Sequence, residues 1–147
     1  RKDLKNTDDL LAVCRALAGE LPQLELELID DVPHVQCLAR KQACDIAFDH
    51  MQGYYGMASL EALSQGLAVI AGLDDWNSAT IRDYFGCDAL PWVIARDRDQ
   101  LADAVRRLVL DPGRRAAIGA ASRRFMESVW TEARLIADLV RFYENLV

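Results

Sequence analysis

The first third of the chain switches between helical and strand-like spacing of its apolar residues. Apolar positions recur with helical spacing over 10–21, behind Thr7 as the expected N-cap, and Pro22 ends this helix. Leucines then alternate with polar residues over 23–28, which predicts a strand with one wetter face. A second helix is expected to open around Pro33.

The middle of the chain repeats this order with more apolar strands. Residues 44–48 predict a short buried strand, and a loop with two glycines follows over 49–56. The next helix is expected over 57–65 and is stopped by Gly66. Residues 67–71 then form another apolar strand.

The last part of the chain is mostly helical. Ser78 is the expected cap of a helix that ends at Phe85, before Gly86, and residues 92–95 predict the last strand. Three helices follow. The first carries an apolar stripe over 101–109, the second begins at Asp111-Pro112, and the third begins at Thr131. Strands that alternate with helices in this way predict an α/β domain with a parallel sheet, helices on both faces and a helical C-terminal tail.

Composition narrows the classes of partner. The chain has 147 residues, which suits one domain, and its net charge of −6 disfavours a broad surface for nucleic acid. Its four cysteines form no C-x-x-C pair and its two histidines are isolated, so we expect reduced thiols, no metal site and a cytoplasmic location. The sequence shows neither a signal peptide nor an apolar run long enough for a membrane span.

The loop at 53–56, Gly-Tyr-Tyr-Gly, leads directly into the helix at Met57. A helix N-terminus offers unpaired backbone N–H groups and a partial positive charge, and glycine lets a ligand approach the main chain. This combination favours a cradle for phosphate or sugar hydroxyls. Glu61, one turn further on, could accept paired hydrogen bonds from a diol. Turn glycines and a solvated glutamate are the alternative interpretation of the same pattern.

A longer stretch strengthens the first interpretation. Residues 43–49, Ala-Cys-Asp-Ile-Ala-Phe-Asp, and 53–70, GYYGMASLEALSQGLAVI, resemble the donor-site signature of GT-B-fold retaining glycosyltransferases of the group-1 or family-4 type. The usual form of that signature is an alanine-aspartate strand, E-G-F-G, a segment ending in L-E-A, and G-x-P-V-I. Residues 1–7 resemble the basic R-x-x-K-G-T segment of this family, and 108–125 resemble its helical tail.

The resemblance implies a role for each matching position. Glu61 matches the glutamate that holds the ribose hydroxyls of the donor nucleotide. Lys5, with Arg1 or Lys2, matches the basic pair that neutralises the departing diphosphate, where negative charge grows in the transition state. The helix start whose backbone amides meet the donor phosphate falls on Gly56, Met57, Ala58 and Ser59.

Three positions depart from the signature. The first glutamate of the motif, which touches the donor sugar in the family, falls on Gly53. A subset resembling D-Q-x-x-x-G-x-Y-G also lacks it, and 49–56 resemble that subset. The expected proline is replaced by Ala68, and Asn6 stands in place of a glycine. Either recognition of the donor sugar has changed, or activity is reduced or lost.

The resemblance also implies an organisation. Residues 1–147 would form a single nucleotide-sugar-binding domain, a Rossmann-like half of a GT-B fold excised from a larger enzyme, with the strand before Arg1 central in the complete sheet. The partners would be a nucleoside-diphosphate sugar and the missing N-terminal domain, with no further cofactor. We expect exposed apolar patches near the strand ends and self-association. The arginine-rich helices in the last third allow peripheral membrane contact.

Two other functions compete with a transferase. A degenerate GT-B domain kept for binding or assembly would also explain the glycine at position 53. A signalling receiver domain shares the alternating pattern, but no lysine follows Lys41. The sequence does not identify the nucleotide base, the sugar or the acceptor. His34 is either a surface residue or a neighbour of the base. His50 is either a structural residue or one that contacts the ligand. Of Tyr54 and Tyr55, one is expected to pack and one to stack on a sugar.

Overall fold

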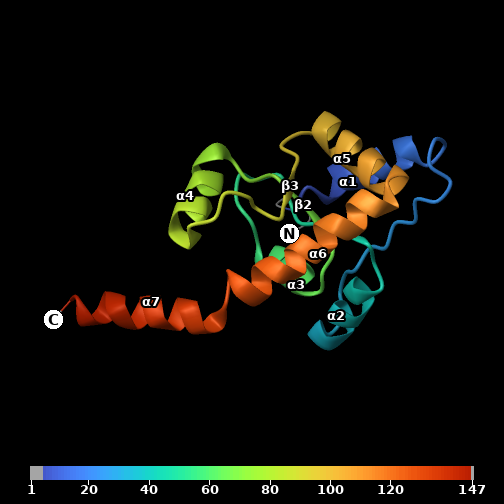
Figure 1. Ribbon diagram of the computed structural model, residues 1–147. Helices are drawn as coiled ribbons and strands as arrows, with labels where there is room; N and C mark the ends of the chain where they lie inside the picture. Colours follow the sequence, from blue (N-terminus) through green and yellow to red (C-terminus); the bar gives the residue numbers. More distant parts are fainter. Residues whose placement is uncertain (1–4, 147) are drawn as a thin grey trace.

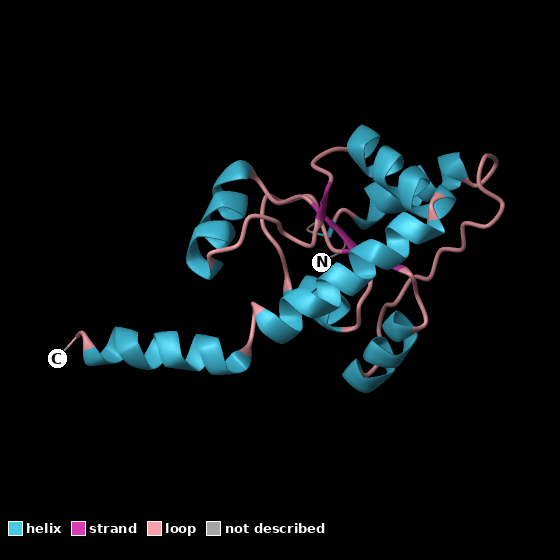
Figure 2. Ribbon diagram, in the orientation of Figure 1, coloured by secondary structure: helices cyan, strands magenta, loops and turns pink. Residues whose placement is uncertain are grey.

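The computed structural model describes residues 5–146 and shows an α/β fold (Figures 1 and 2). Three parallel strands in the order β1-β2-β3 form the sheet, with Ile46 opposite Ala68 and Ile70 opposite Val93. The strands are β1 (Ile46–Phe48), β2 (Ala68–Ala71) and β3 (Val93–Ile94). The helices are α1 (Thr7–Leu17), α2 (His34–Gln42), α3 (Met57–Ser64), α4 (Asp75–Phe85), α5 (Arg98–Leu110), α6 (Pro112–Ser128) and α7 (Glu132–Glu144).

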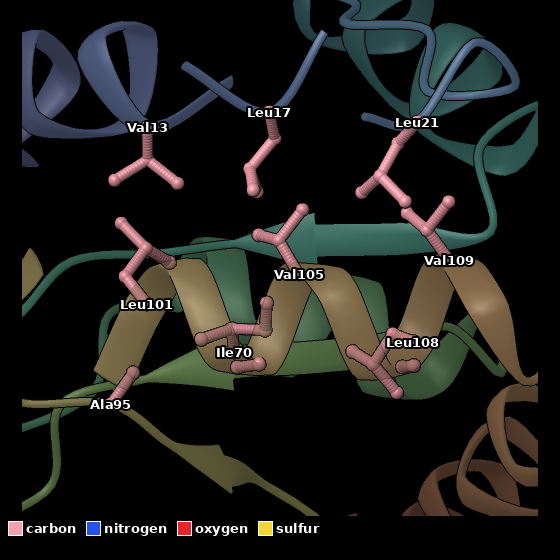
Figure 3. Packing of buried hydrophobic residues seen from close by; sticks show 11 residues of the cluster. Val13, Leu17, Leu21, Ile70, Ala95, Leu101, Val105, Leu108 and Val109 are labelled. Atoms are coloured by element: carbon pink, nitrogen blue, oxygen red, sulfur yellow. The ribbon is translucent and has the colours of Figure 1, made fainter. Parts of the chain in front are cut away.

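Helices cover both faces of the sheet, as the sequence predicted. Because successive strand residues point to opposite faces, β2 divides its side chains between two apolar cores. Ala68 and Ile70 pack with buried residues of α1 and α5, and Figure 3 shows the α1 side chains facing those of α5. Val69 and Ala71 pack on the other face with α3, α4 and α6.

Aromatic side chains close the second core where α6 ends. Trp130 lies between α6 and α7, and its ring centroid is 4.6 Å from that of Phe85 and 5.3 Å from that of Tyr55. Trp92 and Phe125 complete the cluster. The helix α6 lies directly on α3 and β2.

The predicted strand over 23–28 is wrong. This segment forms no strand, and Leu26 and Leu28 are 42% and 44% exposed. Alternating leucines form a strand only beside a free sheet edge, and within residues 5–146 the sheet contains β1, β2 and β3 alone. The alternating pattern therefore belongs to a half-polar segment that forms no hydrogen-bonded ladder with another strand.

Helix ends also differ from the predictions. The helix expected over 10–21 already ends at Leu17, two residues before Gly19, and its N-cap is Asn6 in a left-handed conformation rather than Thr7. Asp74 caps α4 by accepting a hydrogen bond from the Asn77 N–H. Ser78, the cap expected from the sequence, lies inside that helix and is buried.

The last helix, α7, projects from the body of the molecule (Figure 1). Its polar side contacts the end of α4, where Arg134 donates hydrogen bonds to the carbonyls of Tyr84 and Phe85 and the Tyr84 hydroxyl donates to Asp138. Exposed apolar side chains follow the helix: Ile136, Leu139, Val140, Phe142 and Tyr143. Within residues 5–146, no helix combines the length and apolar character needed to cross a membrane.

Candidate functional site

The loop after β1 is fixed against the loop after β2 at the carboxyl edge of the sheet. Gly53 forms a parallel bridge with Leu73, and its carbonyl accepts hydrogen bonds from the Asp74 N–H at 2.8 Å and the Asn77 amide at 3.0 Å. A Cβ on Gly72 would lie 2.5 Å from the Cα of Met51, so glycine permits this close approach. The 49–56 loop is therefore held in one position above α3.

Asp49 is the polar centre of this loop. It directly follows β1, and its side chain is 1% exposed. The carboxylate accepts hydrogen bonds from Lys5 Nζ at 2.9 Å, the Gly56 N–H at 2.5 Å and Ser59 Oγ at 2.9 Å. Burial alone would raise the pKa of Asp49, but these hydrogen bonds outweigh it and hold the pKa below its ordinary value.

The start of α3 falls at Met57, as predicted, with Gly56 as its N-cap. The Gly56 N–H is taken by Asp49, and the Ser59 N–H donates to the Gly56 carbonyl at 3.0 Å. This leaves the N–H groups of Met57 and Ala58, which as first-turn residues have no acceptor within the helix. Of the four amides expected to meet a phosphate, two are thus used by the protein itself.

Lys5 lies at this helix start. Its ammonium would be 3.1 Å from a Cβ on Gly56, and the Lys5 side chain is 47% exposed. The amine therefore contacts Asp49 on one side and remains open to an incoming anion on the other. Arg1 and Lys2, the other predicted basic residues, lie outside the described residues.

Glu61 is held by two residues of α2. Glu61 Oε1 lies 2.9 Å from His34 Nε2, and Glu61 Oε2 accepts from Lys41 Nζ at 2.5 Å. Burial would raise the pKa of Glu61, but the hydrogen bonds from Lys41 and His34 lower it below the ordinary value. Sequence reasoning missed Lys41. Residues 34 and 41 are seven apart and share one face of a helix, but this spacing does not say which residue of another helix they contact.

Gly53 stands at the position where the resembling signature has its first glutamate. Gly53 has a φ of 87°, a left-handed conformation that other residues rarely adopt. A Cβ at this position would also lie 3.1 Å from Asp74 Oδ2. A glutamate at this position would therefore be strained in this loop conformation.

The remaining candidate residues divide between core and surface. His50 is buried, and burial lowers its pKa, although the charge of Asp49 opposes the shift. Its ring centroid lies 4.6 Å from that of Tyr54, which is half exposed. Tyr55 packs against Trp92 and Trp130, which confirms that one of the two tyrosines packs.

Among residues 5–146, no three His, Cys, Asp or Glu side chains are grouped to hold a metal ion.

Comparison with known proteins adds no family assignment to this geometry. No known family model matches the chain, and a search of curated proteins found no match.

Proposed function

We propose that the chain is the donor-binding domain of a retaining glycosyltransferase and binds a nucleoside-diphosphate sugar at the Gly56–Glu61 junction. The observation that carries the proposal is the arrangement along α3. Its open N–H groups and Lys5 lie at the helix start, and Glu61 follows about 6 Å along the axis. A diphosphate at the first place and a ribose diol at the second match this order of donors and acceptors.

Each residue has a distinct task in this proposal. The Met57 and Ala58 N–H groups bind phosphate oxygens, and Lys5 offsets the charge that gathers on the departing diphosphate. Glu61 accepts hydrogen bonds from the ribose hydroxyls. The GT-B assignment, the retention of configuration and a second domain that supplies the acceptor all rest on the sequence resemblance.

A second candidate is a degenerate domain that binds or assembles without transfer. The observation in its favour is Asp49, a carboxylate that already occupies the positive end of α3 and takes the Gly56 N–H. Gly53 adds to this, because the loop offers no motif glutamate to a donor sugar.

Calorimetric titration with uridine, guanosine and adenosine diphosphates tests the proposal. We expect one nucleotide to bind and Glu61→Ala to weaken it at least about tenfold, since a hydrogen bond to a charged group contributes about 1.5–3 kcal/mol. Glu127→Ala is the matched control, because this glutamate lies on α6 and contacts Arg123. Absence of binding by all three nucleotides overturns the proposal. Binding without transfer by an enzyme containing this domain favours the second candidate.

A further inference from the structure

The two groups that hold Glu61 differ sharply in exposure. The side chain of Lys41 is 13% exposed, whereas that of His34 is 68% exposed. Lys41 is therefore an enclosed anchor for Glu61 Oε2, and His34 is a surface group attached to Oε1. A ligand that reaches Glu61 from solvent meets the imidazole at the same time.

Polar contacts fix the helix that carries this histidine. No residue of α2 is buried, and hydrogen bonds connect the helix to neighbouring segments of the chain. Arg40 donates to Glu27 at 2.6 Å and to the Leu28 carbonyl at 3.3 Å, while the Gln65 amide donates to the Leu38 carbonyl at 2.9 Å. These bonds lie in the second half of α2, whereas His34 is the first residue of the helix and its ring is held by the contact with Glu61.

The chemistry of a vicinal diol needs more than a carboxylate. An ionised carboxylate only accepts hydrogen bonds, and its two oxygens offer about four acceptor sites, so Glu61 retains sites beside those used by His34 and Lys41. Each ribose hydroxyl also carries lone pairs that seek a donor. His34 Nε2–H donates to Glu61 Oε1 at 2.9 Å in the free chain, so a hydroxyl that binds at Oε1 can take the place of this oxygen as the acceptor of the same N–H.

We propose that His34 is a second ribose-binding residue, so that His34 and Glu61 together select ribonucleoside diphosphates over nucleotides without the 2′,3′-diol, while Lys41 positions Glu61. This inference rests on the proposed function, and it assigns the site a ligand class that Glu61 alone does not define. The interaction is a specificity contact. His34 takes no part in bond making or breaking.

The test compares two ligands on three proteins. The nucleoside diphosphate that binds in the titration above, and its 2′,3′-dideoxy analogue, are titrated into the wild-type chain, His34→Ala and Arg40→Ala. We expect the wild type to prefer the ribonucleotide at least about tenfold, and His34→Ala to lower this preference at least about threefold while Glu61 retains the rest. Arg40→Ala removes α2 contacts without touching Glu61 and should keep the wild-type preference. His34 is exposed, so its removal should leave the melting temperature unchanged.

The outcomes separate the two proposals. A wild-type preference that His34→Ala leaves intact overturns the role of His34 and leaves nucleotide binding standing. Equal loss of preference in Arg40→Ala also overturns it, because the position of α2 would then be what matters. Equal binding of both ligands by the wild type overturns ribose selection. Absence of nucleotide binding overturns the proposed function, and this inference with it.

Discussion

Two lysine–carboxylate pairs involve the region of α3. They have the same chemistry but differ in burial and in the segments that supply their partners. Lys5 pairs with Asp49 at the start of the helix, and Lys41 pairs with Glu61 one turn inside it. The Asp49 side chain is 1% exposed and accepts from three donors, of which the Ser59 hydroxyl is buried and the Gly56 N–H is partly buried. Glu61 is 24% exposed and both its partners come from the peripheral helix α2.

The difference separates a residue that supports the loop from one that can meet a ligand. Removing the Asp49 carboxylate would leave the buried Ser59 hydroxyl and the partly buried Gly56 N–H without this acceptor. Removing that of Glu61 would leave His34 in solvent and only Lys41 as an enclosed group without its partner. Burial, rather than the presence of an ion pair, therefore distinguishes the two roles.

The largest expected effect follows directly from this comparison. Asp49→Ala should lower the free energy of unfolding by about 3 kcal/mol, because it leaves the buried Ser59 hydroxyl and the partly buried Gly56 N–H without this acceptor. Glu61→Ala should lower it by about 1 kcal/mol, since His34 is solvated and only Lys41 loses an enclosed partner. Urea denaturation of the two variants measures both values. Equal losses would contradict the division into a supporting and a ligand-facing carboxylate.

A smaller effect is expected at Gly56, which lies between the members of the buried pair. A Cβ there would lie 3.1 Å from both Asp49 Oδ1 and Lys5 Nζ, so Gly56→Ala should displace these groups and cost about 1–2 kcal/mol. Gly19→Ala is the control, because no atom lies within 4 Å of its added Cβ. We expect the control to be neutral or slightly stabilising when both are compared by thermal unfolding. A neutral Gly56→Ala would mean that Lys5 moves away freely.

The sequence predicted the buried half of this molecule better than its periphery. The apolar runs that became β1 and β2 and the start of α3 at Met57 were predicted closely, because strand burial and a glycine before a helix leave strong local signals. The strand predicted over 23–28 failed, because alternation describes one strand and carries no information about its neighbour. A pairing partner is a property of the whole sheet.

The candidate site shows the same limit. Local motifs indicated Glu61 and Lys5, and the structure places Glu61 within α3 and Lys5 at the start of that helix. Asp49 belonged to a motif that gave it no role of its own. Its three donors come from residues 5, 56 and 59, which no periodicity links. Lys41 was missed because its partner lies on another helix. Contacts between elements were therefore the part that local patterns could not supply.

The smallest expected effect is a difference in acid sensitivity between the two pairs. Both carboxyl groups have a pKa below the ordinary value in the folded protein. Their contribution to stability is therefore complete above the unfolded-state pKa, about 4, and is lost as pH falls through the folded-state pKa. Asp49→Asn and Glu61→Gln each remove one contribution, so each should flatten the fall in stability at acid pH.

Asp49→Asn should flatten that fall more than Glu61→Gln. Protonation of the buried Asp49 carboxyl weakens hydrogen bonds from three donors, whereas protonation of the more exposed Glu61 carboxyl weakens bonds from two donors, of which His34 is open to water. Urea midpoints measured between pH 7 and pH 3 for the wild type and both variants give the comparison. If Glu61→Gln gave the flatter profile, Glu61 would be the more important structural carboxylate, and the buried pair at Asp49 would not be what fixes the loop above α3.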